Sequence, residues 1–96
     1  MKHKLVGISN GVLDEVWLDG KYIDPAPSQK VYNHSPDGFN HGYCGSGPAQ
    51  LALAIVLKLT GISDGYKDFK NDVIVKIPNG DFSIEFEYNN GTGMII

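Results

Sequence analysis

A helix that is apolar almost all the way round constrains the fold of this chain more than any other feature. The run Leu51–Leu57 is continuously apolar, and Pro48 suits the first turn of a helix, where its missing N–H has no partner to lose. Gly61 is typical of the left-handed residue that ends a helix. A helix without a polar face has to be buried on all sides. We therefore predict a central core helix over residues 48–60, with Gly47 as its cap and Gln50 reaching back to the N–H of that cap.

Two glycine-containing dipeptides divide the N-terminal part of the chain into three β-prone runs. Asn10-Gly11 and Asp19-Gly20 both suit two-residue turns of type I′, in which both central residues have positive φ. Residues 4–23 therefore predict an antiparallel β-meander. The segment Asp24–Ser28 contains two prolines, which lack the N–H that a sheet ladder requires, so we expect the sheet to be interrupted there.

The C-terminal half contains a second helical pattern and one clear strand. Large apolar residues alternate with polar ones over residues 82–88, which predicts a strand with one buried face and one acidic face. Upstream, a helix to about residue 76 is predicted by four apolar residues at helical spacing: Tyr66, Phe69, Val73 and Ile77. A short strand over residues 73–75 is the competing interpretation, because three β-branched residues in a row form helices poorly. The last residues, 89–96, are expected to be loose unless their apolar end docks.

These elements predict a single small α+β domain over residues 1–96. It would contain an N-terminal antiparallel β-meander, two helices and a final antiparallel strand that joins the same sheet. A chain of 96 residues buries roughly 60 to 65% of its unfolded surface, which is enough for one core. The composition, 42% hydrophobic and 20% charged, is that of an ordinary globular protein.

The charged residues and the single cysteine restrict the function. All eight basic residues are lysines and the net charge is −3. The lack of arginine argues against sequence-specific DNA binding, because bidentate contacts to guanine and phosphate favour guanidinium. One cysteine cannot form an internal disulfide, and the apolar runs are too short for a signal peptide or a membrane span. We therefore expect a cytoplasmic protein without a membrane segment.

The segment that leads into the core helix holds most of the candidate ligand-binding residues. Free N–H groups and the positive end of the helix dipole converge at a helix start, so Gly45, Ser46 and Gly47 could cradle an anion that Gln50 also contacts. The motif is neither a Walker loop nor a dinucleotide fingerprint. The competing interpretation is structural, with Gln50 completing the cap and Ser46 satisfying backbone groups of the loop. Tyr43 could anchor a partner or pack the loop onto the sheet.

Metal binding and catalysis are weaker interpretations of the same segment. Zinc would accept four side chains of this segment, but their spacing matches no metal motif: His34, Asp37, His41 and Cys44. Cys44 or Ser46 could pair with a histidine as nucleophile and base, yet no residue can be identified as the third, orienting group. We therefore predict no metal, no cofactor and no catalytic residue.

A longer pattern across this segment resembles a known family. The run His34-Ser35-Pro36-Asp37-Gly38-Phe39, then Gly42-Tyr43 and Gly45-Ser46-Gly47-Pro48-Ala49-Gln50-Leu51-Ala52-Leu53-Ala54-Ile55, is similar to the signature of a domain of unknown function, number 6166. The resemblance implies a small protein of the kind found in bacteria, archaea and phages. That family usually has Trp in place of His41 and Gly in place of Cys44, which argues against an essential chemical role for either residue.

We expect a small non-enzymatic binding or regulatory protein of phage or mobile-element type, with a host-modulating role. It would recognise a partner protein or a small anionic or nucleotide-like ligand through the segment 34–50. The expected ligand-binding residues are His34, Tyr43, Gly45, Ser46, Gly47 and Gln50. Two alternatives stay open. One is a small hydrolase or transferase acting on a phosphorylated or nucleotide-like substrate at the helix start, and the other is a structural subunit whose loop is a homo-oligomer interface.

Overall fold

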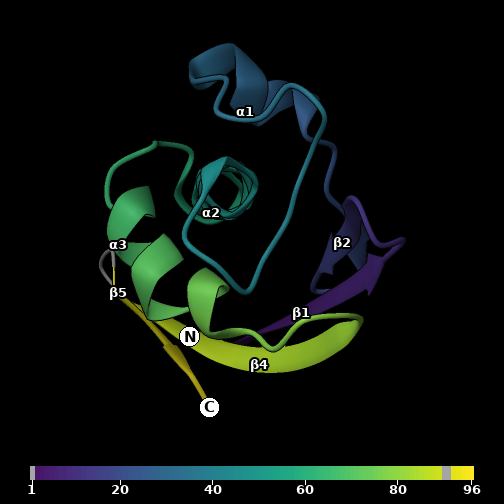
Figure 1. Ribbon diagram of the computed structural model, residues 1–96. Coiled ribbons are helices and arrows are strands. Elements are labelled where there is room, and N and C mark those ends of the chain that lie inside the picture. The colour runs from purple at the N-terminus through teal and green to yellow at the C-terminus, as the bar shows by residue number, and fades with distance from the viewer. Residues whose placement is uncertain (1, 90–91) are drawn as a thin grey trace.

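The computed structural model describes residues 2–89 and 92–96. In this part of the chain one antiparallel sheet has the strand order β3-β2-β1-β4-β5, with the strands β1 (Lys2–Ser9), β2 (Asp14–Leu18), β3 (Lys21–Tyr22), β4 (Phe82–Asn89) and β5 (Thr92–Ile95). Helices α1 (Ala26–Val31), α2 (Ser46–Thr60) and α3 (Tyr66–Asp72) and the 3₁₀ helix η1 (Ile74–Lys76) lie on one side of the sheet (Figure 1). The α+β class, the N-terminal meander and the position of β4 in the same sheet confirm the prediction.

Helix α2 is the centre of the core, as predicted. In Figure 1 it runs through the middle of the molecule, with α1 above it, α3 beside it and the sheet curving beneath. Leu51, Leu53 and Ile55 are fully buried, and each such side chain stabilises the fold by roughly 1.5–3 kcal/mol. The helix ends at Gly61, which has the predicted left-handed φ of 80°.

The start of α2 differs from the prediction. The helix begins at Ser46 with Gly45 as its cap, so the expectation that Gly47 caps the helix was wrong. Pro48 becomes the third helical residue, which is still within the first turn, where no intrahelical N–H bond is lost. No side chain caps this end, because the Gln50 amide is engaged elsewhere.

One of the two predicted type I′ turns is present. Asp19 and Gly20 have φ of 52° and 83° and join Leu18 to its partner Lys21 across the ladder. The prediction for Asn10 was wrong, because the β1–β2 ladder ends at the pair Ser9 and Asp14 and leaves a longer loop. In that loop the Asn10 carboxamide oxygen accepts the N–H groups of the residues two and three positions later, each at 2.9 Å, and this local contact replaces a tight turn.

The structure adds elements that the sequence patterns did not predict. The proline-rich segment forms α1, whose first N–H is held by the Asp24 carboxylate at 2.9 Å; proline is tolerated at such a helix start. The second predicted helix divides at Val73, where φ is −125° and ψ is −59°, and η1 follows, so the strand alternative over residues 73–75 was wrong. In the C-terminal tail Thr92–Ile95 dock on β4 as β5, whereas residues 90 and 91 lie outside the described residues.

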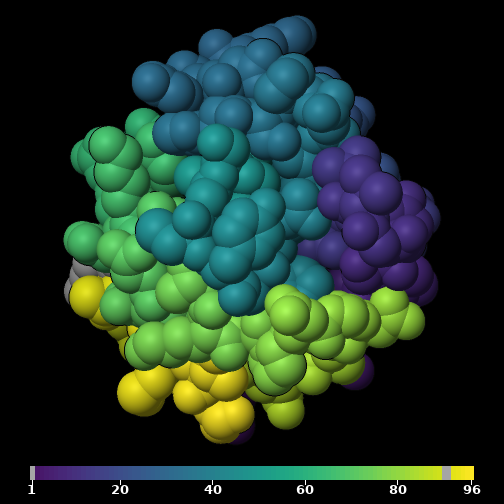
Figure 2. All heavy atoms as spheres, viewed as in Figure 1, coloured from purple at the N-terminus to yellow at the C-terminus, as the bar shows by residue number. Residues whose placement is uncertain are grey.

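Much of the segment between α1 and α2 lies at the surface, while its Phe39 and His41 are buried. Figure 2 shows its teal-coloured atoms between α1, the purple N-terminal hairpin and the green elements that follow α2. None of the helices in the described ranges has both the length and the apolar character needed to cross a membrane.

Candidate functional site

The Gln50 side chain fixes the segment before α2 to the core. It is fully buried, and its carboxamide oxygen accepts the backbone N–H groups of His34 and Ser35 at 2.8 and 2.9 Å. Its amide nitrogen donates to the Ser28 hydroxyl at 2.8 Å and to the Tyr32 carbonyl at 3.2 Å. All the hydrogen-bonding positions of a carboxamide that this geometry can use are filled by the chain itself. Gln50 is therefore a positioning residue, and the capping contact predicted for it does not form.

Two of the residues whose backbone Gln50 contacts, Tyr32 and His34, carry aromatic rings at the surface. Tyr32 is 60% exposed, and its ring stacks on the imidazole of His34 with centroids 4.3 Å apart. The His34 Nε2 atom lies 2.8 Å from the hydroxyl of Tyr66, the first residue of α3. Tyr32 at the end of α1 and Tyr66 at the start of α3 thus both contact the imidazole of His34 in the loop.

Two lysines of α3 make this surface positive. Burial first, and then the ammonium groups of Lys67 and Lys70, lower the pKa of His34 below its ordinary 6.5, which favours the neutral imidazole. Burial also raises the pKa of Tyr66 above 10.0, which keeps its hydroxyl protonated as a hydrogen-bonding group. We call Tyr32, His34, Tyr66, Lys67 and Lys70 the basic aromatic surface.

Cys44 adjoins the basic aromatic surface. It is exposed, and the Lys70 ammonium lies 3.6 Å from its sulfur. No group of three or more His, Cys, Asp or Glu side chains in residues 2–89 and 92–96 is arranged to hold a metal ion. The candidate zinc ligands instead take separate partners, Tyr66 for His34, Asp14 for His41 and Lys70 for Cys44.

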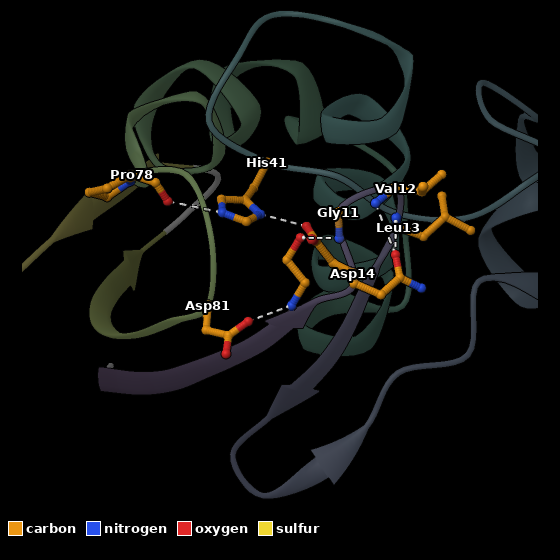
Figure 3. A network of polar contacts seen from close by, with 9 residues as sticks. Gly11, Val12, Leu13, Asp14, His41, Pro78 and Asp81 are labelled. Atoms are coloured by element: carbon orange, nitrogen blue, oxygen red, sulfur yellow. Dashed lines mark hydrogen bonds and ion pairs between the residues drawn. The ribbon is translucent and has the colours of Figure 1, made fainter.

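A buried Asp14–His41 pair holds the middle of the same loop. The His41 Nδ1 atom lies 2.5 Å from Asp14 Oδ2, and its Nε2 atom lies 3.0 Å from the carbonyl oxygen of Pro78 (Figure 3). The two side chains are 4% and 1% exposed. Both neighbours of the ring are acceptors, so an N–H on either ring nitrogen has a partner to which it can donate. The pair joins the start of β2, the loop and the turn before β4.

The Asp14–His41 pair lacks the free nitrogen that a catalytic base needs. In a nucleophile–base–acid arrangement one ring nitrogen faces the acid and the other faces the nucleophile. Here the second nitrogen faces the Pro78 carbonyl, which supplies no proton and cannot react. The geometry therefore supports a structural role for this pair. The sequence contained one sign of it, because the alternation along β2 places Asp14 on the same face as the buried Val16 and Leu18.

The glycines of the loop allow close internal packing. A Cβ atom on Gly47 would lie 2.6 Å from Asn40 Cβ, and one on Gly45 would lie 2.5 Å from the ring of Tyr43. Gly42 has φ of 81°, and its N–H donates to the Ile74 carbonyl at 3.0 Å. The close approaches that these glycines permit are therefore made by the protein's own residues.

The predicted ligand-binding residues divide into two groups. His34 belongs to the basic aromatic surface, and Gln50 supports it from the core. The other four lie at or just before the start of α2, where Ser46 and Tyr43 are exposed, Gly45 is the cap and Gly47 is buried. Sequence reasoning missed Tyr32 and Lys67 as parts of the site, because their proximity to His34 depends on the docking of α1 and α3.

Two hollows of the surface lie away from the basic aromatic surface. One of about 310 Å³ is lined by Asn40, Tyr43 and Asn79 above the Asp14–His41 pair. Another, of about 280 Å³, lies between β3 and the end of α2, where Tyr22 and Lys58 line it. Neither hollow is lined by a residue of the basic aromatic surface.

The fold and this site define a small α+β domain whose loop before the central helix is held in place by two buried polar contacts. The family of unknown function DUF6166 matches residues 9–88, which is more than half of the chain, and the chain belongs to that family. The matched range includes Asp14, His41, Gln50 and the whole basic aromatic surface. No curated protein and no solved structure matches the chain.

Proposed function

We propose that this protein is a small non-enzymatic binding protein that recognises an acidic surface of a partner protein through the basic aromatic surface. The observation that carries the proposal is the local reversal of charge. The chain has a net charge of −3, yet Lys67 and Lys70 flank His34 closely enough to lower its pKa. An electropositive patch on an acidic protein steers acidic partners towards itself.

The aromatic residues supply the second half of the argument. Tyrosine is enriched at the centres of protein interfaces, because its ring buries a large area and loses little conformational entropy. Tyr32 is exposed but already stacked on His34, so little ordering remains to be done on binding. The hydrogen bonds of Gln50 to both of these residues add to this preorganisation.

The shape of the site favours a macromolecule over a nucleotide. Small ligands bind in concave sites that cover most of their surface. The hollows described above are lined by other residues, and the start of α2 lacks a donor at Pro48. Binding is favoured over hydrolysis or group transfer because the Nε2 atoms of both histidines already have partners. That of His34 faces the Tyr66 hydroxyl, and that of His41 faces the Pro78 carbonyl. We place this activity in the cytoplasm, in keeping with the exposed free thiol of Cys44.

The proposal can be tested by NMR with an acidic probe. An oligoglutamate peptide is titrated into the ¹⁵N-labelled protein, with ATP and inorganic phosphate as comparison ligands. The peptide should shift the amides of residues 32–34 and 66–70, and the double variant Lys67→Glu/Lys70→Glu should lose this response. The matched control is Lys21→Glu/Lys58→Glu, which removes two lysines that line a hollow elsewhere and should keep the response.

Three results would count against the proposal. One is the absence of any shift at these amides with the peptide. Another is an equal loss of the response in the control variant, which would indicate binding by net charge alone. The third is a stronger and localised response to phosphate or ATP at Gly45 and Ser46, which would favour a small anionic ligand at the start of α2.

A further inference from the structure

The outer face of the sheet is not covered by the described part of the chain. All helices lie on the other side, and β1 and β4 form the centre of the sheet (Figure 1). Side chains on this face alternate with the core residues, so Lys4 and Glu85 point outward while their neighbours Leu5 and Phe86 are fully buried.

Two rows of opposite charge run along the middle of this face. The row on β1 is Lys2 and Lys4, and the row on β4 is Glu87 and Glu85, with Lys2 opposite Glu87 and Lys4 opposite Glu85 in the ladder. In residues 2–89 and 92–96 neither Lys4 nor Glu85 forms an ion pair within 4.0 Å. Their charges are thus available to an oppositely charged surface.

Apolar side chains flank the two rows on both sides. On β2, next to the basic row, the half-buried Trp17 faces outward beside Val6. Next to the acidic row, Met94 and Ile96 are 65% and 60% exposed, and Ile96 pairs with the backbone of Glu85. Beside Lys4 and Glu85 the order across the face is therefore apolar, basic, acidic and apolar, and the exposed Glu15 lies on the same face farther along β2.

We propose that this face binds a second copy of the chain, sheet against sheet. A twofold axis parallel to the strands and between β1 and β4 places β1 of one copy over β4 of the other. Lys4 of each copy then meets Glu85 of its partner, and β2 with Trp17 lies over β5, the strand that precedes Ile96. Packed sheets keep their strands within about 30° of each other, so these rows stay in contact. The proposal is independent of the basic aromatic surface.

The charge pattern selects this axis over the other in-plane twofold. An axis perpendicular to the strands would place β1 over β1 and β4 over β4, so lysine would meet lysine and glutamate would meet glutamate. Such like-charge contacts suppress an arrangement. The four strands that overlap are spaced about 4.8 Å apart, and with about six residues each in contact they give a face of roughly 19 by 20 Å. This is about half of the roughly 800 Å² per partner of a standard interface, so the dimer should be weak and reversible.

The charge rows allow a test that uses mixed variants. In Lys4→Glu the partner contacts become two acidic pairs, and in Glu85→Lys they become two basic pairs. Each variant alone should associate at least tenfold more weakly than the wild type in sedimentation velocity runs over a concentration series. An equimolar mixture of the two restores an attractive pair at both contacts, so it should sediment as the wild type does.

Matched controls change the same charges on the helical side. Lys58→Glu and Asp68→Lys, alone and mixed, should associate like the wild type. Circular dichroism of each variant checks that it is folded, and the recovery in the mixture excludes misfolding as the reason for monomers. A wild type that stays monomeric at every concentration overturns the proposal. So does a dimer that Lys4→Glu leaves intact, or a pair of folded variants whose mixture fails to associate.

Discussion

Replacing Gln50 with leucine should destabilise the protein by about 3 kcal/mol. The change leaves the N–H groups of His34 and Ser35 and the carbonyl of Tyr32 without their partner, and it removes a donor to the buried Ser28. A buried polar group left unpaired costs about 1–3 kcal/mol. Water can reach the half-buried His34 and Ser35, which keeps the sum near the lower end, and leucine recovers part of the loss through its apolar side chain.

The measurement is unfolding in urea and by heat, followed by circular dichroism. A domain of this size melts about 4–8 °C lower per kcal/mol, so Gln50→Leu should lower Tm by roughly 12–24 °C. The matched control is Gln29→Leu, which loses a single hydrogen bond, from the Gln29 amide to the Ser35 carbonyl, and should cost about 1 kcal/mol. If the two variants are equally stable, and the amide of His34 exchanges no faster in Gln50→Leu, the positioning role assigned to Gln50 is refuted.

A glutamate at position 50 tests the accepting and the donating side of the Gln50 carboxamide separately. Gln50→Glu keeps the acceptor for the N–H groups of His34 and Ser35 but places a carboxylate against the Tyr32 carbonyl. Burial should raise the pKa of the new carboxyl above about 4.3, so the folded state binds its proton more tightly than the unfolded state. The free energy of unfolding of the variant should therefore approach that of the wild type as the pH falls through the raised pKa towards about 4.3, and the full difference should be present above the raised pKa.

Other predictions follow from the same geometry. Gly47→Ala should cost on the order of 2 kcal/mol in urea unfolding, since its Cβ would lie 2.6 Å from Asn40 Cβ; a variant as stable as the wild type would contradict this packing. Asp14→Ala and His41→Ala should each cost about 3–5 kcal/mol, and the double variant should lose less than their sum, because each single change leaves a buried polar partner alone. The pKa of His34, measured by NMR, should rise towards 6.5 when either flanking lysine is changed to glutamine, and an unchanged value would remove the electrostatic basis of the basic aromatic surface.

The parts of the fold that were predicted correctly are those specified by short stretches of sequence. The apolar run of α2, the alternation of β4 and the Asp19-Gly20 turn each carry their signal within a few neighbouring residues. Helix α1 was not predicted because it is only six residues long and its prolines indicated only an interruption of the sheet. It is held by contacts with a distant residue, since the Ser28 hydroxyl and the Tyr32 carbonyl accept hydrogen bonds from Gln50. The strand β5 was missed because its pairing with β4 is what fixes it.

The candidate site could be predicted only in part, because its contacts join distant positions. Gln50 stood out as a polar residue on an apolar helix, yet its partners lie 15 to 22 residues earlier in the chain. Tyr66 reaches His34 across 32 residues, and no spacing rule connects them. The resemblance argued against an essential chemical role for His41, whereas its carboxylate partner, 27 residues away, gives it a buried structural role.

Directional contacts explain how a loop without helix or strand can present a defined surface. The chain between α1 and α2 is long for an irregular connection in a small domain. Apolar packing alone would hold it near the core without fixing its rotation, because dispersion contacts have little directionality. The Gln50 network fixes the loop near its start, and the Asp14–His41 pair fixes it further along. A variant that loosens either contact should therefore disturb the basic aromatic surface as well as the core, so the stability of this fold and the shape of the basic aromatic surface depend on the same buried groups.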